Sequence, residues 1–447
     1  KMTSVTNEIF NINKSLRIDE SIESLRFVEY EPSNTSAYNE STDITIDVSA
    51  QDNFVLPCKS YLLIEGVLKT AADAVYDAKA NVSLVNNAIA FMFSKVTYLL
   101  NGSEVESISD PGQATTMRGI LMYDENYNSS TGMSLGWVRD MGDGTAKEAN
   151  TGHVLRNNLT INKAKGHFSF VMPLAHLFGF CTDYKQVLYG CKHTMKLSRA
   201  GNNNAILRGA ASATDGSPFK VGEAGKIIIN KLMWYMPHVS PSLEVKTALM
   251  EMIASKIKID IPYRALYCES TEVPSGKSSH DWRITTQSGN VAPRWLVIGF
   301  QTARENNQEK NNAIFDHLQA TKVFVTLNSD QYPGNATTQD YDFGTYRISR
   351  AYKDFRDFKS QYIGDSYLTG STSINMTEYT ELYPLFVIDL RYQAERLKNN
   401  IRDITVHFKC AANIPASTRI YGLVISDRLF TICSDGNSFQ TIIQMFF

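Results

Sequence analysis

Short segments in which polar and apolar residues alternate recur along the whole chain. Residues 43–48 read Asp-Ile-Thr-Ile-Asp-Val, so every second side chain is apolar, as in a strand with one face in a core. Similar runs predict further strands at residues 25–30, 61–68, 91–100, 168–174, 194–198, 226–235, 256–261, 295–300, 322–327, 385–390, 404–409 and 419–425. Many short strands and few helices predict an all-β protein made of sandwiches or barrels.

One block of sequence occurs twice. Asn-Asn-Ala-Ile stands at residues 86–89 and again at residues 311–314, and each copy is followed by a Lys-Val pair and then a Leu-Asn pair. An aromatic-aliphatic run precedes each copy, and a Pro-Leu pair follows each. Because the repeated unit is about two hundred residues long, a whole domain is duplicated. We predict two tandem eight-stranded jelly-roll domains, residues 1–240 and 241–447, with a few short helices.

A helix is expected where the two halves meet. Ser240 can cap it, with Pro241 at the first helical position, where a missing N–H costs nothing. Its apolar positions fall on one face at helical spacing: Val245, Leu249, Met252 and Ile253. We expect this helix to link the two β domains.

Two other segments, residues 115–123 and 346–362, also have helical spacing. The second carries Ile348, Tyr352 and Phe355 on one face. Its remaining surface mixes basic residues with Asp354 and Asp357, which is typical of a solvated helix face, so we interpret it as a contact surface only.

Long polar segments separate the predicted elements at residues 124–165, 199–223, 328–344 and 364–377. Loops of this length in a compact domain usually supply functional surface. A shorter connection, Asn101-Gly102, predicts a hairpin turn because its glycine tolerates a positive φ.

The charge of the chain is nearly balanced, with 44 basic and 46 acidic residues and a formal charge of −2. A dedicated nucleic-acid-binding protein would carry a strong basic excess, so we expect any contact with a genome to be local. The six cysteines lie mostly in apolar runs, which favours reduced, buried thiols and a cytosolic or nuclear folding compartment. Residues 1–11 lack the apolar core of a signal peptide, and residues 80–94 and 166–182 are too short or too polar to span a bilayer.

Two short motifs match enzyme signatures but lack their context. Gly132-Met133-Ser134-Leu135-Gly136 fits the nucleophile elbow G-x-S-x-G, which needs a strand before the serine and a helix after it. Polar and glycine-rich segments flank it instead. Gly276-Lys277-Ser278 resembles the end of a phosphate-binding loop, but Thr271 replaces the leading glycine and Pro274 interrupts the N–H donors.

Candidate metal ligands also form incomplete sets. Cys181, Cys191 and His193 lack a fourth ligand at zinc spacing, and packing explains them better. Asp140 and Asp143 lie in a turn-like segment without the alternating oxygen ligands of a calcium loop. We therefore expect no catalytic, cofactor-binding or metal site, and a protein that is not an enzyme.

The C-terminal sequence resembles the double jelly-roll major capsid proteins of DNA viruses and related elements, particularly the Maverick/Polinton and adintovirus type. The similar residues lie within 383–436. They are Tyr-Pro-Leu-Phe-Val-Ile-Asp-Leu at 383–390, Glu-Arg-Leu at 395–397, Asn-Ile-Pro-Ala at 413–416, Val-Ile-Ser-Asp-Arg at 424–428 and Ser-Asp-Gly at 434–436. The N-terminal half is similar in its succession of strands and loops.

This resemblance implies a structural protein that forms homotrimers. Their six barrels approximate a hexagon, and such blocks tile an icosahedral shell around a DNA genome. The implied partners are the chain itself, neighbouring trimers, and penton and minor capsid proteins. The implied location is the virion capsid, assembled in the nucleus or cytoplasm of a host cell. A carbohydrate-binding or hydrolytic β-sandwich protein remains the alternative, and it would need an aromatic groove or an acid/base pair.

The C-terminal tail, residues 439–447, is unusually apolar and ends in Met445-Phe446-Phe447. Exposed, these side chains would promote aggregation, so we expect the tail to be docked. Either it completes the second jelly roll as a final strand, or it reaches a neighbouring subunit or minor capsid protein.

Overall fold

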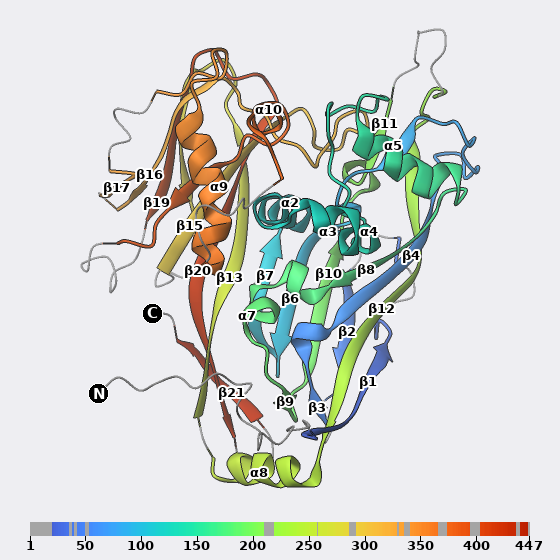
Figure 1. The fold of residues 1–447 in the computed structure, drawn as a ribbon, viewed down its shortest axis with the longest axis vertical. Coiled ribbons are helices and arrows are strands. Elements are labelled where there is room, and N and C mark those ends of the chain that lie inside the picture. Colours follow the sequence, from blue (N-terminus) through green and yellow to red (C-terminus); the bar gives the residue numbers. More distant parts are fainter. Residues whose placement is uncertain are drawn as a thin grey trace, which may run out of the picture.

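The computed structural model describes residues 20–34, 38–39, 43–49, 53–209, 219–256, 258–285, 292–328, 330–334, 340–364, 373–393, 403–434 and 439–445. Two β-rich halves stand side by side, and the helix α8 (Leu243–Ala254) joins them at one end of the molecule (Figure 1). Residues 1–11, considered above for a signal peptide, lie outside the described ranges, as do the last two residues of the tail.

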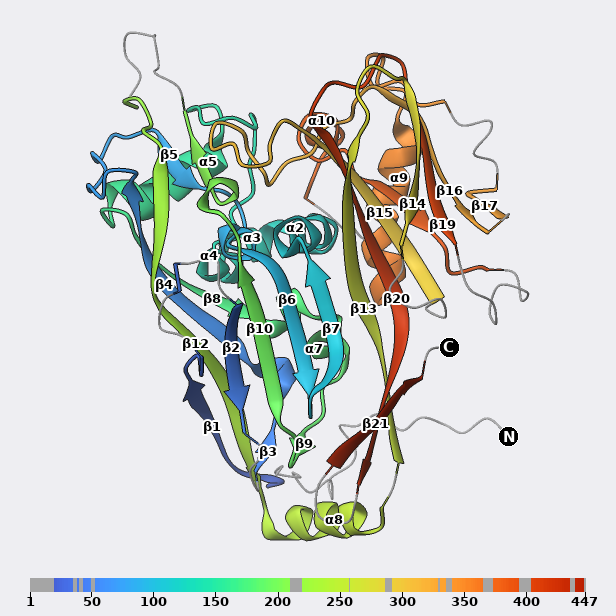
Figure 2. The ribbon, with the colours of Figure 1, turned by 180° about the vertical axis from the view of Figure 1, so that it is seen from behind.

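The first half contains two principal sheets (Figure 2). One has the strand order β8 (His167–Pro173), β4 (Tyr61–Thr70), β12 (Gly225–Pro241) and β1 (Ile22–Tyr30), with β3 (Phe54–Val55) and β9 (Leu188–Tyr189) beyond β12. The other has the order β2 (Asp43–Val48), β10 (His193–Arg199), β6 (Phe93–Leu100) and β7 (Ser103–Ser109). A separate pair, β5 (Val82–Leu84) and β11 (Ile206–Arg208), lies at the end remote from α8 (Figure 2).

The second half repeats the arrangement of the eight main strands, without counterparts of β3 and β9. One sheet has the order β18 (Phe386–Asp389), β15 (Ala292–Thr302), β20 (Thr418–Ser434) and β13 (Lys258–Val273). The other has the order β14 (Ser279–Ile284), β19 (Ile404–Cys410), β16 (Ala320–Leu327) and β17 (Asp330–Tyr332). The strands β6 and β16, which follow the two Asn-Asn-Ala-Ile blocks, occupy equivalent places. The prediction of two eight-stranded jelly rolls is confirmed.

The alternation of polar and apolar residues predicts correctly which side chains lie in the core. In β2, Ile44, Ile46 and Val48 are at most 1% exposed, while the residues between them are only partly buried. Asn101 and Gly102 both have positive φ and connect β6 to β7, so the predicted hairpin turn is confirmed. We still propose the boundary of the two domains at residues 240 and 241, where β12 gives way to α8.

The linker helix begins later than predicted. The N-cap is Ser242 rather than Ser240, and Pro241 is the last residue of β12 instead of the first of the helix. The reason is tertiary pairing: Pro241 lies opposite Ile22 in the ladder between β12 and β1. This ladder extends the strand through residues that local capping signals assign to a helix.

Besides the short strands β3, β5, β9 and β11, three strands escaped prediction, namely β7, β14 and β17. Their sequences are rich in serine, charged residues and glutamine, so they lack an apolar run. Several predicted strands are also longer than expected. For example, β13 and β20 pair over sixteen residues of β13, from Lys258 to Val273.

The prediction of a loop at residues 124–165 is wrong in its main feature, because this segment folds into short helices. These are α3 (Glu125–Ser129), α4 (Thr131–Leu135), α5 (Thr151–Asn157) and η3 (Asn158–Asn162). Trp137 and Asp140 between them are at most 1% exposed. A Cβ on Gly119 of α2 (Pro111–Met122) would lie 2.2 Å from the Trp137 ring, so a glycine is required there. The prediction failed because polar contacts, not apolar periodicity, fold this segment.

The other predicted helices and the tail are largely as expected. The helix α9 (Ser349–Ile363) lies along the second jelly roll (Figure 1) with Phe355 and the preceding Ile348 fully buried. The backbone of β21 (Phe439–Met445) pairs with residues 429–434 of β20, so the tail docks as a final strand of the second jelly roll. The predicted loops at 199–223, 328–344 and 364–377 lie partly outside the described residues.

Candidate functional site

The serine of the nucleophile-elbow motif lies inside a helix. Ser134 is an exposed residue of α4, and its hydroxyl donates to the carbonyl oxygen of Thr131 at 2.7 Å. A nucleophile elbow instead places its serine on a sharp turn between a strand and a helix.

We predict that Ser134→Ala changes the free energy of unfolding by less than about 0.5 kcal/mol, as is usual for an exposed position. A serine-reactive probe should not label the native protein. Specific labelling at Ser134 by mass spectrometry would contradict this reading.

The remaining motif residues are dispersed. Gly276 has φ 77° in the turn between β13 and β14. Cys181, Cys191 and His193 are all buried, and His193 Nδ1 lies 2.7 Å from the hydroxyl of Tyr98. The cysteines are free thiols, four of them buried, as expected: Cys58, Cys181, Cys191, Cys268, Cys410 and Cys433. In the part of the chain that the structure describes, no three His, Cys, Asp or Glu residues are grouped so as to hold a metal ion.

The most extensive polar construction joins the two jelly rolls. Glu106 of β7 is fully buried and accepts backbone N–H groups from Gly179, Phe180 and Leu266 at 3.1, 3.1 and 2.7 Å. Leu266 belongs to β13 of the other jelly roll. Burial raises the pKa of the Glu106 carboxyl, and the three N–H donors oppose that rise.

A second carboxylate, that of Asp183, binds β13 in the same way at Arg264, two residues before Leu266. Asp183, which ends α7 (Gly179–Asp183), accepts the backbone N–H and the guanidinium of Arg264 at 2.6 to 2.9 Å. The guanidinium also stacks on the Tyr362 ring, 3.7 Å from its centroid. Glu106 and Asp183 thus satisfy the N–H groups on the outer edge of β13, where an unpaired strand edge would invite aggregation.

The joint continues toward the end remote from α8. The side-chain amide of Gln308 exchanges two hydrogen bonds with the backbone of Gly225 at 2.9 and 2.7 Å. The backbone carbonyl of Gln308 accepts from Arg208 N at 2.8 Å. Side chains from both jelly rolls therefore bond across the interface along much of its length, including Tyr263 to Val105 and Ser270 to Asp110. The two barrels form one block.

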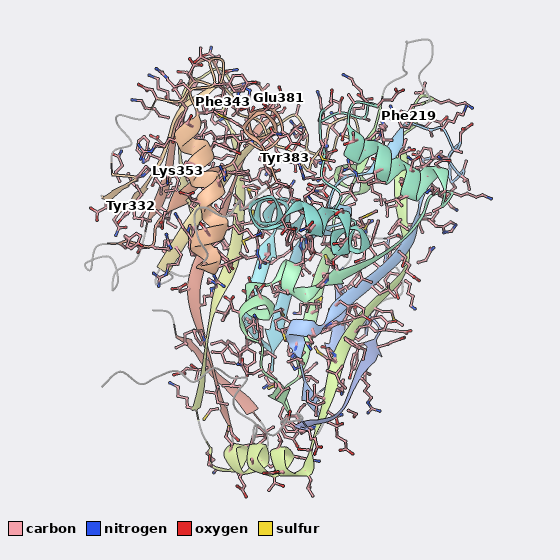
Figure 3. All side chains as sticks on the ribbon, viewed as in Figure 1. Phe219, Tyr332, Phe343, Lys353, Glu381 and Tyr383 are labelled. Atoms are coloured by element: carbon pink, nitrogen blue, oxygen red, sulfur yellow. The ribbon has the colours of Figure 1, made fainter. Side chains whose placement is uncertain are left out.

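The repeated Asn blocks have a structural role at this joint. Asn86 Oδ1 accepts from Val138 N, and Asn311 Nδ2 donates to the carbonyl of Gly144. Residues 136–144 are therefore held from both jelly rolls. Tyr383, which lies between the two halves in Figure 3, adds a hydrogen bond from its hydroxyl to the carbonyl of Asp140 at 2.8 Å. Sequence reasoning found the repeat but not this role.

Arg139 lies in this segment, residues 136–144, and strengthens its attachment by an ion pair between the jelly rolls. Its guanidinium bonds Glu378 of α10 (Met376–Glu381) at 3.1 Å and Glu125 at 3.2 Å. Only 7% of the Arg139 side chain is exposed, so the pair is shielded from solvent on the arginine side.

We predict that Glu106→Gln loosens the joint. The amide of glutamine offers one acceptor oxygen and turns an NH₂ group toward backbone N–H donors, so at least one donor loses its partner. The expected loss is about 1–3 kcal/mol of unfolding free energy, with faster hydrogen exchange at Gly179, Phe180 and Leu266.

The matched control is Glu104→Gln, an exposed position in the same strand. It should leave exchange at the joint unchanged. Equal exchange in the two variants would show that Glu106 does not hold the jelly rolls together.

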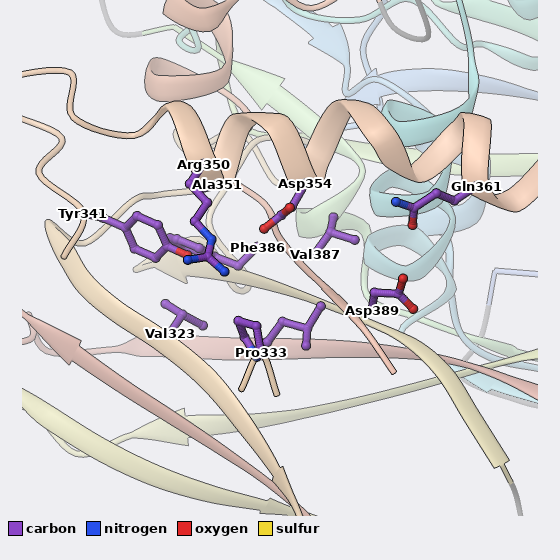
Figure 4. A pocket seen from close by; sticks show the side chains of 11 residues that line it. Val323, Pro333, Tyr341, Arg350, Ala351, Asp354, Gln361, Phe386, Val387 and Asp389 are labelled. Carbon is purple, nitrogen blue, oxygen red and sulfur yellow. The ribbon is translucent and has the colours of Figure 1, made fainter. Parts of the chain in front are cut away.

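A small pocket lies beneath α9 (Figure 4). Arg350, Asp354 and Gln361 reach into it from the helix, and Asp389 lies opposite in β18. Burial raises the pKa of the Asp354 carboxyl. The volume of about 130 Å³ suits a few water molecules of about 30 Å³ each. Ligand pockets usually measure about 300–1,000 Å³, so this one is too small for an organic cofactor.

Among the described segments, no helix is both long and apolar enough to cross a membrane.

The geometry defines a protein that consists of two matching jelly rolls bonded into one block. Residues 82–430 match the family model described as the double jelly roll-like domain, and the chain belongs to this family. The resemblance found in the C-terminal sequence is confirmed. No curated protein matches the sequence.

Solved structures share the fold across nearly the whole chain at low identity. The cryo-EM structure of the Sputnik virophage is 12% identical with a TM-score of 0.58, covering 99% of this chain and 93% of that one. The mavirus major capsid protein is 11% identical with a TM-score of 0.54, covering 99% and 96%. The PBCV-1 virus capsid is 10% identical with a TM-score of 0.54, covering 96% and 99%.

Proposed function

We propose that the protein is a structural, non-enzymatic major capsid protein. The observation that carries this proposal is the repetition of one strand order in two jelly rolls that are bonded into a single block. Three copies of such a block present six similar barrels around a threefold axis, which approximates a hexagon. Hexagonal units tile flat facets, so homotrimers of this chain would form the faces of an icosahedral shell around a DNA genome.

The similar structures support this proposal, since they are the PBCV-1 virus capsid, the Sputnik virophage and the mavirus major capsid protein, and each covers at least 96% of this chain. Penton and minor capsid proteins would be further partners, and the virion the final location. Assembly would take place in the nucleus or cytoplasm of the host cell.

The short helices, strands and turns remote from α8 are the proposed outer crown or trimer contacts. They include α5 and β11 (Figures 1 and 2), from the segments first predicted as long loops at residues 124–165 and 199–223. Long connections between strands are retained when they supply surface, because their closure entropy grows only logarithmically with length.

Light scattering after size-exclusion chromatography tests the trimer. A mass of about 150 kDa, three times the 50.1 kDa of one chain, is expected. A stable monomer that binds a glycan would instead support the alternative of a carbohydrate-binding sandwich.

A further inference from the structure

The joint between the two jelly rolls brings together one sheet edge from each. The strand β7 ends the sheet β2-β10-β6-β7 of the first jelly roll, and β13 ends the sheet β18-β15-β20-β13 of the second. Glu106 of β7 accepts the N–H of Leu266 in β13 at 2.7 Å. Asp183 of α7, the helix that follows β8 in the chain, accepts the N–H of Arg264 at 2.9 Å. The joint therefore consists of β7 and α7 on one side and β13 on the other.

Both edges have a counterpart on the outside of the chain. Because the two jelly rolls share one strand order, β1 corresponds to β13 and β17 corresponds to β7. The two counterparts lie at opposite outer edges of the molecule (Figures 1 and 2), and Tyr332 marks the β17 side in Figure 3. One copy can therefore present its β1 side to the β17 side of the next copy.

The register of the strands shows which residues correspond. The aromatic-aliphatic runs before the two Asn-Asn-Ala-Ile blocks align Leu62 of β4 with Leu296 of β15. Leu62 and Tyr30 face the same residue of β12 from its two sides. Leu296 and Tyr267 face the same residue of β20 in the same way. Tyr30 of β1 therefore corresponds to Tyr267 of β13.

This correspondence extends to the two positions at which the joint binds β13. Phe27 lies three residues before the tyrosine of β1, as Arg264 does before that of β13. Glu29 likewise corresponds to Leu266. The strand β1 thus carries an aromatic ring where β13 carries the arginine that Asp183 holds.

The opposite side of the molecule is also aromatic. Glu106 faces the residue two before the leucine of the first Leu-Asn pair, and Tyr332 faces the residue two before the leucine of the second. Tyr332 therefore takes the place of Glu106. Tyr392, which follows β18 as α7 follows β8, is 82% exposed. Together β17 and Tyr392 form the outer edge of the second jelly roll.

The β1 edge, formed by Ile22, Leu25 and Phe27, is open and apolar. In the described part of the chain β1 pairs with β12 alone, and the three side chains are 52%, 39% and 44% exposed. The Phe27 ring lies 5.5 Å from that of Tyr61, which stacks on Tyr235 at 4.9 Å. Open strand edges with exposed apolar residues associate with other chains unless they are covered, and aromatic residues are enriched in protein interfaces.

We propose that the β1 edge of one copy binds the outer edge of the second jelly roll of another copy, so that the joint within the chain is repeated between chains. The contact joins two different surfaces, and such head-to-tail contacts close into a ring when the rotation between copies allows it. Aromatic side chains replace the carboxylate and the arginine of the joint within one chain. The inference rests on the proposed function, because it names the surfaces that meet in the proposed trimer.

A photo-crosslinking amino acid at position 27 of the full chain tests this contact. A mixture of isotopically heavy and light chains distinguishes crosslinks between chains from crosslinks within one chain. We expect crosslinks between chains, to residues 325–332 or 390–393. In a protein that is trimeric by light scattering, crosslinks to other surfaces, crosslinks only within one chain, or none would overturn this contact and leave the proposed function in place. A protein that stays monomeric would overturn both.

A pair of variants provides a second readout. Phe27→Glu should raise the dissociation constant of the trimer at least about tenfold, because it places a charge in an apolar contact. The control is Leu243→Glu, at a position of α8 that is 82% exposed, and it should match the unmodified protein. Both variants should keep the far-UV circular dichroism spectrum of the unmodified protein. Equal dissociation constants in the two variants would show that the β1 edge does not bind another copy.

Discussion

Three buried histidines of the first jelly roll are expected to lower the free energy of unfolding by about 6 kcal/mol when the pH falls from 7 to 5. Burial lowers the pKa of His153, His176 and His193 to about 3. In the unfolded chain a histidine titrates near its ordinary pKa of about 6.5. Between these values the unfolded state binds protons that the folded state does not. Each residue then costs about 1.4 kcal/mol per pH unit as the pH falls below about 6.5.

The hydrogen bonds of His153 and His176 agree with neutral rings. His153 lies between Ser83 Oγ at 2.8 Å and Asn81 Oδ1 at 2.7 Å. His176 lies between the Tyr123 hydroxyl at 2.7 Å and Asn87 Oδ1 at 3.1 Å. Each ring has one partner that can donate and one amide oxygen that accepts, so a second ring proton is not needed.

Denaturant unfolding at several pH values measures this effect. His193→Gln should reduce the slope of stability against pH by about 1.4 kcal/mol per pH unit between pH 6 and 5. Glu106 acts in the opposite sense, because burial raises the pKa of its carboxyl and favours the folded state at low pH. The control is His167→Gln at an exposed position of β8, and its slope is compared with that of His193→Gln. Identical slopes in the two variants would refute the assignment.

Arg156→Met is expected to cost about 3–5 kcal/mol, because it leaves a buried carboxylate without its cation. The guanidinium bonds Asp140 Oδ1 at 2.6 Å, with side chains 4% and 0% exposed. It also donates to the carbonyl oxygens of Leu84 and Val138. The conformation of the segment at residues 136–144, which both jelly rolls hold, depends on this pair.

An exposed ion pair of the same length provides the control. Arg283 and Asp403 also lie 2.6 Å apart, but their side chains are 73% and 40% exposed. Arg283→Met should cost at most about 1 kcal/mol. Combining Arg156→Met with Asp140→Leu should recover part of the loss, since removing both charges is cheaper than removing one. Similar unfolding free energies for the two single variants would contradict the structural role of the pair.

Local pattern alone predicted most strands of the four principal sheets. Residues 43–48 alternate strictly, and their structure matches the prediction residue for residue. The repeated Asn blocks indicated the duplication, and the strands that follow them are equivalent. The hairpin turn at Asn101-Gly102 could also have revealed β7, because such a turn requires a returning strand.

The joint between the jelly rolls could not be predicted in the same way. Glu106 and Leu266 are far apart in the sequence, and a glutamate in a polar segment carries no signal of burial. The start of α8 was likewise decided by the pairing of Pro241 with Ile22 rather than by capping. Contacts of long sequence separation therefore determined the features that the pattern missed.

Cryo-electron microscopy of the purified, assembled protein tests the central claim most directly. The account predicts trimers of hexagonal outline in which each chain contributes two adjacent jelly rolls, arranged side by side in flat facets of a closed shell. Dispersed single chains under assembly conditions, or particles in which the two jelly rolls of one chain separate, would contradict it.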